Sequence, residues 1–176
     1  MRKVLVLSAA IGLAGVLCAG ETNTARIAVF FSPSGGCTQA IVGEIGRAKS
    51  TIQMQAFSFS SAPIARALVD AHKRGVNVQV IMDKSVETEE HSSANTVLRG
   101  GVTVLMDAQH SIAHNKVMVI DSQVVITGSF NFTHAAEAYN AENVLVIRDR
   151  DLARKYGDNW HAHAAHSKPY TPARPE

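Results

Sequence analysis

Cysteine is nearly absent from this chain, which has two among its 176 residues, Cys18 and Cys37. Cys18 lies in an N-terminal segment that we expect to be removed, so Cys37 would remain alone. A lone cysteine cannot form an internal disulfide, and the fold must rely on its hydrophobic core. The chain from Glu21 onward is long enough for one compact domain with such a core.

Long hydrophobic runs are also lacking, except at the N-terminus. There, residues 4–20 (VLVLSAAIGLAGVLCAG) follow Arg2 and Lys3. This is the pattern of a secretory signal peptide, and the run is too short and too weakly flanked for a stable membrane span. We predict a cleaved signal peptide at 1–20 and a single domain at 21–176. The mature protein is expected to be periplasmic or secreted, without a stable membrane anchor.

An excess of one charge is missing as well. Loss of the signal peptide removes Arg2 and Lys3, so the total of lysine and arginine falls from 17 to 15 and equals the 15 aspartates and glutamates. A formally neutral protein is not a strongly basic nucleic-acid carrier. Any binding of phosphate must therefore come from a local cluster of polar side chains.

Strand and helix patterns alternate along the rest of the chain, without an internal repeat or a linker. Short apolar or alternating runs predict strands, and apolar residues at helical spacing predict helices. Predicted strands cover 26–31, 51–57, 76–83, 102–107, 116–120, 124–127 and 143–149, and predicted helices cover 38–49, 61–75, 86–100, 133–140 and 150–166. This order indicates an α/β fold, with a mixed β-sheet sandwiched between helices. The tail at 167–176 is expected to be an extended or mobile end.

The segment 114–132, HNKVMVIDSQVVITGSFNF, combines two apolar runs with regularly spaced polar residues. The runs flank a short polar connection, which predicts a hairpin. Residues two apart on a strand face the same side, so His114 projects with Lys116, and Ser129 projects with Asn131. The start of one strand and the end of the next lie at the same end of a hairpin, which would bring all four side chains together.

These four side chains suit a tetrahedral anion. Lys116 supplies a positive charge and Asn131 an amide donor, while a neutral His114 is free to act as a nucleophile on phosphorus. Gly128 permits a close approach of the backbone to a ligand. Asp121 lies at the hairpin turn, an odd number of residues from His114, so we expect a structural role for it. The simpler alternative is a buried hairpin with polar residues at its turns.

The pattern H-x-K-x4-D-x6-G-S-x-N in this segment resembles the HKD motif of the phospholipase D superfamily, with each motif residue at the family spacing. A short exported chain with one copy of the motif is similar to the small bacterial endonucleases of that superfamily. The resemblance implies a phosphodiesterase that works through a phosphohistidine and needs no metal or other cofactor. It assigns His114 as nucleophile or acid, and Lys116, Ser129 and Asn131 as phosphate-binding residues.

One motif leaves a two-histidine mechanism incomplete, because superfamily members use a second motif histidine to protonate the leaving oxygen. A homodimer would supply it, with His114 of each subunit flanking a shared site on the two-fold axis. A carboxylate is also expected to orient the histidine. We assign this role to Glu142, which matches the family's acidic position. Glu137 is the alternative, unless it is a solvated residue on its helix.

The remaining histidines receive simpler interpretations. His161, His163 and His166 invite a metal site, but only the last two share a helix face, and closed sites usually need three or four convergent ligands. A solvated helix is the better interpretation, and no metal is expected. His110 and His134 could contact substrate, but single histidines more often lie at a surface or in a core.

Two further features could serve nucleic acid or phosphate. Phe57, Phe59, Phe130 and Phe132 could stack on bases, but their strand spacing favours the core. The turn-rich segment 32–37, SPSGGC, could bind an anion through its backbone, but a plain loop is the simpler interpretation.

The function expected from the sequence is an exported phosphodiesterase, most simply a non-specific endonuclease acting on DNA, single- or double-stranded, or on RNA. A small domain without a base-reading module would contact mainly the phosphate backbone, which carries no sequence information. A phospholipid phosphodiesterase remains open, although a clear amphipathic membrane helix is lacking. A phosphate- or nucleic-acid-binding module without turnover also remains open, although arginine would serve pure anion binding better than His114.

Overall fold

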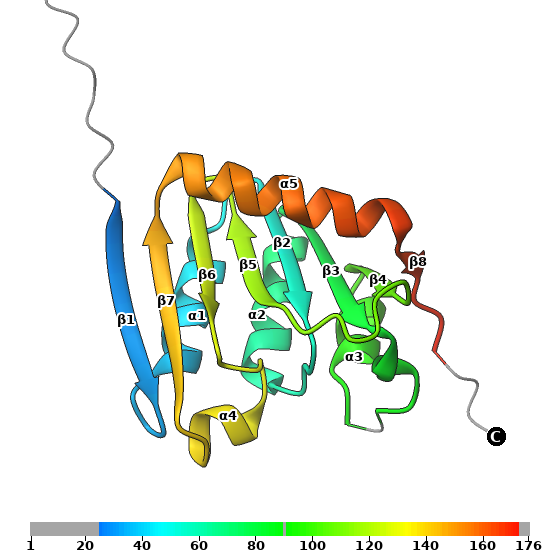
Figure 1. Cartoon of the computed structure of the whole chain (residues 1–176), viewed down its shortest axis with the longest axis horizontal. Coiled ribbons are helices and arrows are strands. Elements are labelled where there is room, and N and C mark those ends of the chain that lie inside the picture. The colour runs from blue at the N-terminus through cyan, green and yellow to red at the C-terminus, as the bar shows by residue number, and fades with distance from the viewer. Residues whose placement is uncertain (1–24, 90, 173–176) are drawn as a thin grey trace, which may run out of the picture.

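The computed structural model describes residues 25–89 and 91–172, and these form an α/β fold (Figure 1). The predicted signal peptide at 1–20 and the end of the tail at 173–176 lie outside the described residues. The strands are β1 (Arg26–Ser32), β2 (Thr51–Ala56), β3 (Asn77–Asp83), β4 (Thr103–Asp107), β5 (Lys116–Ile120), β6 (Val124–Gly128), β7 (Glu142–Arg148) and β8 (Lys168–Pro169). The helices are α1 (Cys37–Arg47), α2 (Ala62–Lys73), α3 (Ala94–Arg99), α4 (His134–Ala138) and α5 (Arg150–His166).

All the described strands join one mixed sheet with the order β1-β7-β6-β5-β2-β3-β4-β8. β2, β3 and β4 run parallel, and the other neighbours are antiparallel. The predicted hairpin is present as β5 and β6, in which Val117 pairs with Thr127. Its neighbours are β2 and β7, so the motif segment lies inside the sheet. β1 forms one edge of the sheet and pairs with β7, from Arg26 opposite Arg148 onward.

Helices cover both faces of this sheet. α1 and α2 pack on one face, and α5 crosses the other (Figure 1). On β5, Met118 and Ile120 belong to the core under α1 and α2, while Val117 and Val119 pack toward α5. Burial on both faces explains why this strand is a continuous apolar run in the sequence. Among the described helices, none combines the length and the apolar character needed to cross a membrane.

Two segments differ from the sequence prediction. The predicted helix 86–100 is a short 3-10 turn, Lys84–Glu87, followed by α3. Residues 87–93, ETEEHSS, contain no apolar side chain with which a continuous helix could pack. The start of the tail is held as a strand, since β8 pairs with β4. Tyr170 behind it is buried, and its hydroxyl donates to Oδ1 of Asn95 at 3.2 Å.

Candidate active site

The motif residues gather at the edge of the sheet where β2 and β6 end and β5 begins. The first residue of β5, Lys116, lies opposite the last residue of β2, Ala56. The chain after β2 ties the site together, because its backbone N–H groups donate to carbonyls on both sides of the hairpin. Phe57 donates to Asn115 and Ser60 donates to Phe132, each at 3.1 Å. The predicted gathering of the two ends of the motif segment thus follows from the strand pairing.

The ring of Phe57 contacts the two basic side chains of the motif, His114 and Lys116. Its ring centroid lies 4.6 Å from that of His114 and 5.0 Å from Nζ of Lys116. An ammonium at this distance from a ring face is stabilised by a cation–π interaction. The assignment of Phe57 to the core is therefore wrong, since its side chain is half-buried and belongs to the site. The other three phenylalanines are buried in the core, namely Phe59, Phe130 and Phe132.

Lys116 lies at the base of the site. It is 8% exposed, and its ammonium donates to the backbone carbonyl of His114 at 2.9 Å. Burial lowers the pKa of Lys116, and the negative charge of Glu142 opposes part of this effect. The side chain of His114, in contrast, is exposed. The site therefore combines a buried cation with an exposed imidazole that a substrate can reach from solvent, and both contact the ring of Phe57.

The orienting contact predicted for Glu142 is not formed within one chain. Its Oε1 accepts from the side-chain amide of Asn140 at 3.0 Å, and its backbone N–H donates to Ser32. In the part of the chain that the structure describes, the imidazole of His114 has no hydrogen-bond partner and contacts the ring of Phe57. Glu142 thus acts on Lys116 through its charge, and no neighbour among the described residues fixes the tautomer of His114.

Glu137, the alternative orienting residue, binds the start of α1 instead. Its carboxylate accepts from the backbone N–H of Gly36 at 3.3 Å and from that of Thr38 at 2.7 Å. A carboxylate at this position pairs with helix N–H groups that have no partner within the helix. Within the segment 32–37, the N–H of Gly36 binds an anion, so a plain loop is an incomplete description. The anion is the half-buried carboxylate of Glu137 in the same protein, which pairs with the start of α1 and not with His114.

The phosphate-binding candidates after β6 differ in how their polar groups are used. Oγ of Ser129 accepts from the backbone N–H of Asn143 at 3.1 Å and from its side-chain amide at 3.2 Å. Oδ1 of Asn131 is buried and has no hydrogen-bond partner among the described residues. Buried polar atoms are rarely left unpaired without a ligand or water to satisfy them. This amide oxygen is an acceptor and is therefore free for a hydrogen-bond donor, whereas a phosphate oxygen would have to be bound by the side-chain N–H group of Asn131.

Gly128 is required by the packing of the backbone. A Cβ at this position would lie 2.1 Å from the backbone oxygen of Asn143 on the neighbouring strand. Its φ of 154° is also one that other residues rarely adopt. The close approach predicted for Gly128 is real, but it is made to β7.

Asp121 lies at the opposite end of the hairpin. Its carboxylate accepts from the backbone N–H groups of Lys49, Ser50 and Thr51 and from the hydroxyl of Ser50, at 2.8 to 3.0 Å. Burial alone would raise the pKa of Asp121, but these hydrogen bonds hold it below its usual range. The residue ties the hairpin turn to the loop between α1 and β2, which is the kind of structural role that its spacing predicts.

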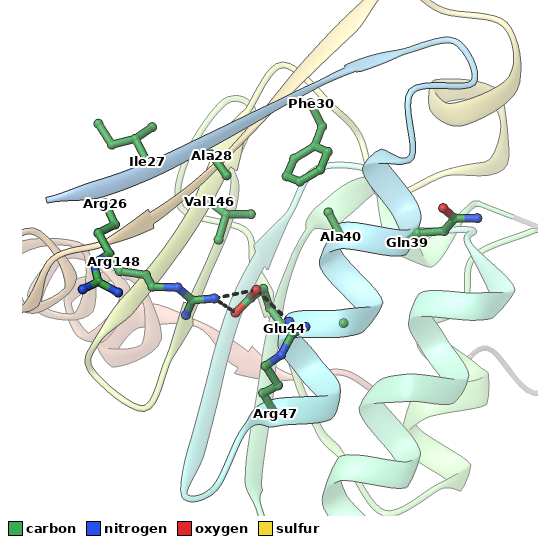
Figure 2. Close-up of a pocket in the computed structure, with 11 residues that line it drawn as sticks. Arg26, Ile27, Ala28, Phe30, Gln39, Ala40, Glu44, Arg47, Val146 and Arg148 are labelled. Carbon is green, nitrogen blue, oxygen red and sulfur yellow. Dashed lines mark hydrogen bonds and ion pairs between the residues drawn. The ribbon is translucent and has the colours of Figure 1, made fainter.

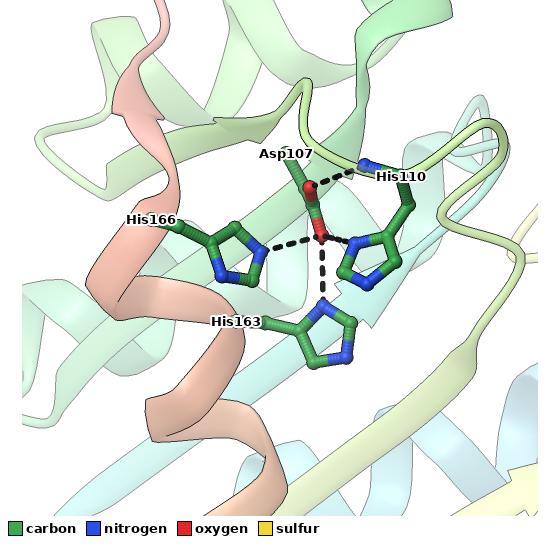
Figure 3. A group of neighbouring side chains, drawn as sticks. All are labelled: Asp107, His110, His163 and His166. Atoms are coloured by element: carbon green, nitrogen blue, oxygen red, sulfur yellow. Dashed lines mark hydrogen bonds and ion pairs between the residues drawn. The ribbon is translucent and has the colours of Figure 1, made fainter.

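A second polar cluster surrounds Asp107 (Figure 3). Its Oδ2 lies 2.9 Å from Nδ1 of His110, 2.8 Å from Nδ1 of His163 and 3.2 Å from Nε2 of His166. Burial alone would raise the pKa of Asp107, but the interactions with the histidines hold it well below its usual range. The prediction of a solvated helix is therefore wrong for His163 and His166, whose side chains are 14% and 25% exposed. It holds for His161, which is exposed.

A cavity of about 310 Å³ lies between β1 and α1, away from the motif (Figure 2). Three of its charged residues pair with one another. Glu44 accepts from Arg148 at 2.8 and 2.9 Å and from Arg47 at 2.9 Å. The pair of Arg148 with Glu44 joins β7 to α1, and none of the motif residues lines the cavity.

Comparison with known proteins agrees with this geometry. The family described as "Cardiolipin synthase, PLD-like domain" matches residues 41–163. The chain is 45% identical to "Phospholipase D" of Rickettsia felis over 140 residues, which is 80% of this chain and 70% of that protein. It is 36% identical to "Mitochondrial cardiolipin hydrolase" of Xenopus tropicalis over 110 residues, 62% of this chain and 52% of that protein. The crystal structure of Nuc from Salmonella typhimurium, a phospholipase D family member, superposes with a TM-score of 0.80 at 35% identity and covers 84% of this chain and 99% of that one.

The family match contains the whole motif, from His114 to Asn131. The similarity to Nuc and the mixed sheet with its covering helices confirm the α/β fold predicted from the sequence. The resemblance drawn from the motif is confirmed as well, by a family match over most of the chain. The chain therefore belongs to the phospholipase D superfamily and is a phosphodiesterase of that superfamily.

Proposed function

We propose that the protein is a metal-independent endonuclease that cleaves DNA, single- or double-stranded, and RNA with little sequence preference. The observation that carries this proposal is the exposed imidazole of His114 and the buried ammonium of Lys116, both against the ring of Phe57 at an edge of the sheet. A polymer backbone can lie across such an edge and present one diester at a time. Phe57 and His114 add ring faces of the kind on which bases stack without sequence preference.

In the proposed mechanism, the imidazole of His114 attacks phosphorus, and a P–N bond forms as the bond to the leaving oxygen breaks. A second imidazole donates its proton to that oxygen. The same imidazole, now neutral, then removes a proton from water, whose oxygen attacks phosphorus and releases His114. Lys116 and Asn131 bind the non-bridging oxygens and stabilise the charge that develops on them.

The second imidazole is proposed to come from the same residue of a partner subunit. Among the described residues, the ring contact of His114 is with Phe57, and no second histidine contacts its ring. A two-fold axis beside the site would place the partner's His114 across the phosphate. In such a dimer, Glu142 of the partner subunit is the proposed orienting carboxylate, because Glu142 does not reach the imidazole of its own chain.

Subunit mixing tests the shared site. Exchange of the wild-type protein with a tenfold excess of His114→Ala subunits should suppress nearly all activity, because almost every wild-type subunit then has an inactive partner. His161→Ala subunits are the matched control, since this histidine is exposed on α5, and they should leave activity unchanged. A sedimentation experiment that finds a fully active monomer would overturn the dimer proposal.

Substrate assays with excess chelator test the nuclease. The mature protein is incubated with plasmid DNA, single-stranded DNA, RNA and vesicles of phosphatidylcholine or cardiolipin. Cleavage of the nucleic acids by the wild type, and not by His114→Ala, is the expected result. Nucleic-acid binding without products from any substrate would identify a binding module and contradict the enzymatic proposal.

A phospholipid phosphodiesterase is the second candidate. It is favoured by the names of the relatives, "Phospholipase D" and "Mitochondrial cardiolipin hydrolase". Ile112, two residues before His114, is 58% exposed, and Tyr139 is 76% exposed, so apolar groups are present for contact with a lipid surface. Release of headgroup from the vesicles without cleavage of DNA or RNA would select this candidate over the nuclease.

A further inference from the structure

Four potential metal ligands converge outside the motif site (Figure 3). Asp107 is the last residue of β4, His110 follows it in the β4–β5 loop, and His163 and His166 lie in the last turns of α5. One ligand atom from each residue lies within 4.8 Å of the other three. More than fifty residues separate the two histidines of the helix from the other members, so the fold alone brings this set together.

The spacing of these atoms suits a tetrahedral ion. The three imidazole nitrogens lie 2.8, 2.9 and 3.2 Å from Oδ2 of Asp107. A tetrahedral zinc ion with bonds of about 2.0–2.1 Å holds its ligand atoms about 3.3 Å apart. The three rings also lie close together with tilted planes, and their centroids are separated by 4.8, 5.2 and 5.4 Å. Small outward shifts of the side chains would therefore open a position for one ion between the four ligand atoms.

Hydrogen bonds within the cluster do not satisfy all of its buried nitrogen atoms. Oδ2 of the fully buried Asp107 pairs with Nδ1 of His110 and of His163. Nε2 of His166 is buried 3.2 Å from the same oxygen, close enough for an ion pair when the ring is protonated, but within the described residues it makes no hydrogen bond. A buried imidazole nitrogen without a hydrogen bond is costly, and coordination to a metal would satisfy it.

We propose that Asp107, His110, His163 and His166 bind one Zn²⁺ ion. Three imidazoles and a carboxylate are the nitrogen and oxygen ligands that zinc accepts in proteins. Four protein ligands fill a tetrahedral shell, so the ion is structural and takes no part in the cleavage of the diester. The side chain of His110 is 44% exposed, which leaves a route from solvent to the site.

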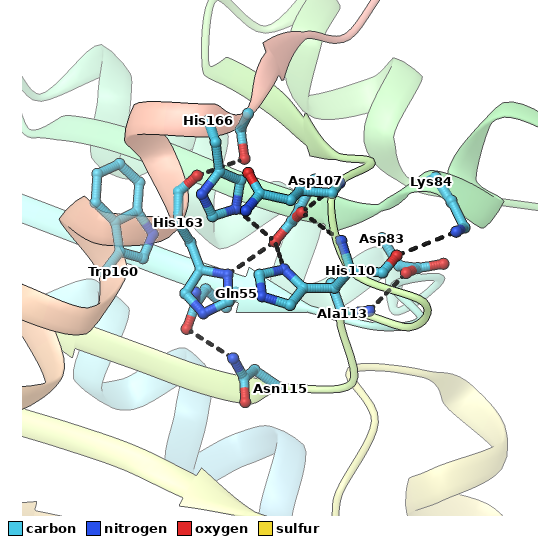
Figure 4. Close-up of polar contacts among 12 residues, drawn as sticks. Gln55, Asp83, Lys84, Asp107, His110, Ala113, Asn115, Trp160, His163 and His166 are labelled. Atoms are coloured by element: carbon cyan, nitrogen blue, oxygen red, sulfur yellow. Dashed lines mark hydrogen bonds and ion pairs between the residues drawn. The ribbon is translucent and has the colours of Figure 1, made fainter.

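The ion would anchor the loop that leads to the catalytic histidine (Figure 4). This loop, 108–113, is already held at its far end, where Oδ2 of Asp83 accepts from the backbone N–H of Ala113 at 2.7 Å. At its near end, Oδ1 of Asp107 accepts from the N–H of Gln109 at 3.0 Å. Coordination by His110 would add a link from the same loop to α5. The metal site thus stabilises the approach to His114 from a position outside the reaction.

Binding of the metal itself tests the proposal. The full mature protein is stripped with chelator, dialysed, and titrated with Zn²⁺ in a calorimeter. We expect one ion per chain and a higher midpoint of thermal unfolding, and Co²⁺ should give the strong visible absorption of a tetrahedral site. Substoichiometric binding with an unchanged unfolding midpoint would overturn the proposal. Neither readout depends on catalysis, so an inactive protein would leave this test intact.

Two variants on α5 test whether Zn²⁺ binds at the proposed cluster. His166→Ala should weaken Zn²⁺ binding at least tenfold and abolish the rise in the unfolding midpoint. His161→Ala is the matched control, because its Nε2 contacts Gln53 at 3.1 Å and not the cluster. His110→Ala, in the exposed loop, should show the same loss if His166→Ala fails to fold. Wild-type affinity in folded His166→Ala or His110→Ala would show that the ion binds elsewhere.

Discussion

The two ends of the β5–β6 hairpin use their polar groups in opposite ways. At the turn, the carboxylate of Asp121 accepts four hydrogen bonds from the loop before β2 and from the first residue of that strand. At the open end, the imidazole of His114 has no hydrogen-bond partner in the described part of the chain, and Oδ1 of Asn131 is buried without one. The same hairpin therefore has one end where the carboxylate is fully hydrogen-bonded (saturated) and one end where polar atoms lack hydrogen bonds (unsaturated), about one strand length apart.

This difference separates stability from reactivity within one motif. A saturated polar group stabilises the fold, and removing it lowers the free energy of unfolding. An unsaturated group adds little to stability and is available to a substrate. Loss of polar groups at the Asp121 end should therefore act on unfolding, and loss of those at the His114 end should act on turnover. Three polar variants test this division, and a fourth variant, at Gly128, tests the backbone packing beside the open end; they are taken in order of the expected change in free energy.

His114→Asn should have the largest effect. Loss of a catalytic nucleophile typically reduces turnover about 10⁴-fold or more, which is about 5 kcal/mol of transition-state stabilisation. The side chain is exposed, so the urea midpoint of unfolding should stay within the error of the wild type. Steady-state cleavage of a fluorescent oligonucleotide and a urea titration measure both quantities. Substantial residual turnover would remove His114 from the chemistry.

Lys116→Met should come second. Loss of a cation that binds the phosphate should lower kcat/KM by about 10²- to 10³-fold, or about 3–4 kcal/mol. Because burial disfavours the ammonium, its replacement by an apolar side chain of similar length should leave stability at neutral pH equal or higher. A clear loss of stability together with normal kcat/KM would show that Lys116 stabilises the fold and does not act on the substrate.

Gly128→Ala should destabilise the fold by about 2–3 kcal/mol, as expected for an added methyl group in tight packing. Its Cβ would meet the backbone oxygen of Asn143, which cannot move away without disturbing β7. Gly46→Ala is the matched control, because nothing lies within 4 Å of a Cβ at that position in α1. Thermal unfolding of both variants provides the measurement, and equal midpoints would contradict the close packing of β6 on β7.

Asp121→Ala should cost about 1–2 kcal/mol of stability, since its hydrogen bonds are partly exposed to solvent. Turnover per folded molecule should not change. The exposed Asp70→Ala on α2 is the control and should be neutral.

The pH dependence of Asp121→Ala sharpens this prediction. The pKa of Asp121 is lowered in the folded protein, so its contribution is complete above the unfolded pKa of about 3.9 and is lost as the pH falls through the folded pKa. Urea titrations should therefore show a constant gap to the wild type from pH 7 to about 5 and a narrowing gap below about 4. A gap that persists unchanged in acid would assign the effect to the lost side-chain packing.

The parts of the site that were predictable lie within one hairpin. Residue parity and strand pairing suffice to place His114 beside Lys116 and to send Asp121 to the other end, because both rules act over a few residues. Phe57 was misplaced because its role depends on β2 being the neighbour of β5. That pairing joins residues more than fifty positions apart, and periodicity along one segment carries no information about it.

The same limit explains the other corrections. Glu137 binds the start of α1 across about a hundred residues of sequence, and no local pattern distinguishes this from a solvated glutamate. The last turns of α5 have the spacing of a polar surface helix, yet Asp107 lies beneath two of their histidines. The broad fold was predictable, since strand and helix patterns are local, but the strand order that places these partners together was not.

The pairing of β1 has a consequence for the order of folding. Its neighbour in the sheet is β7, so β1 cannot pair until β7 is available. Arg26 lies opposite Arg148, which is among the later residues of the domain to be synthesised. Closing so long a loop is entropically unfavourable until the intervening strands have formed. The hairpin with the catalytic motif, in contrast, closes over a few residues. We therefore expect the centre of the sheet to form early and its N-terminal edge to join last.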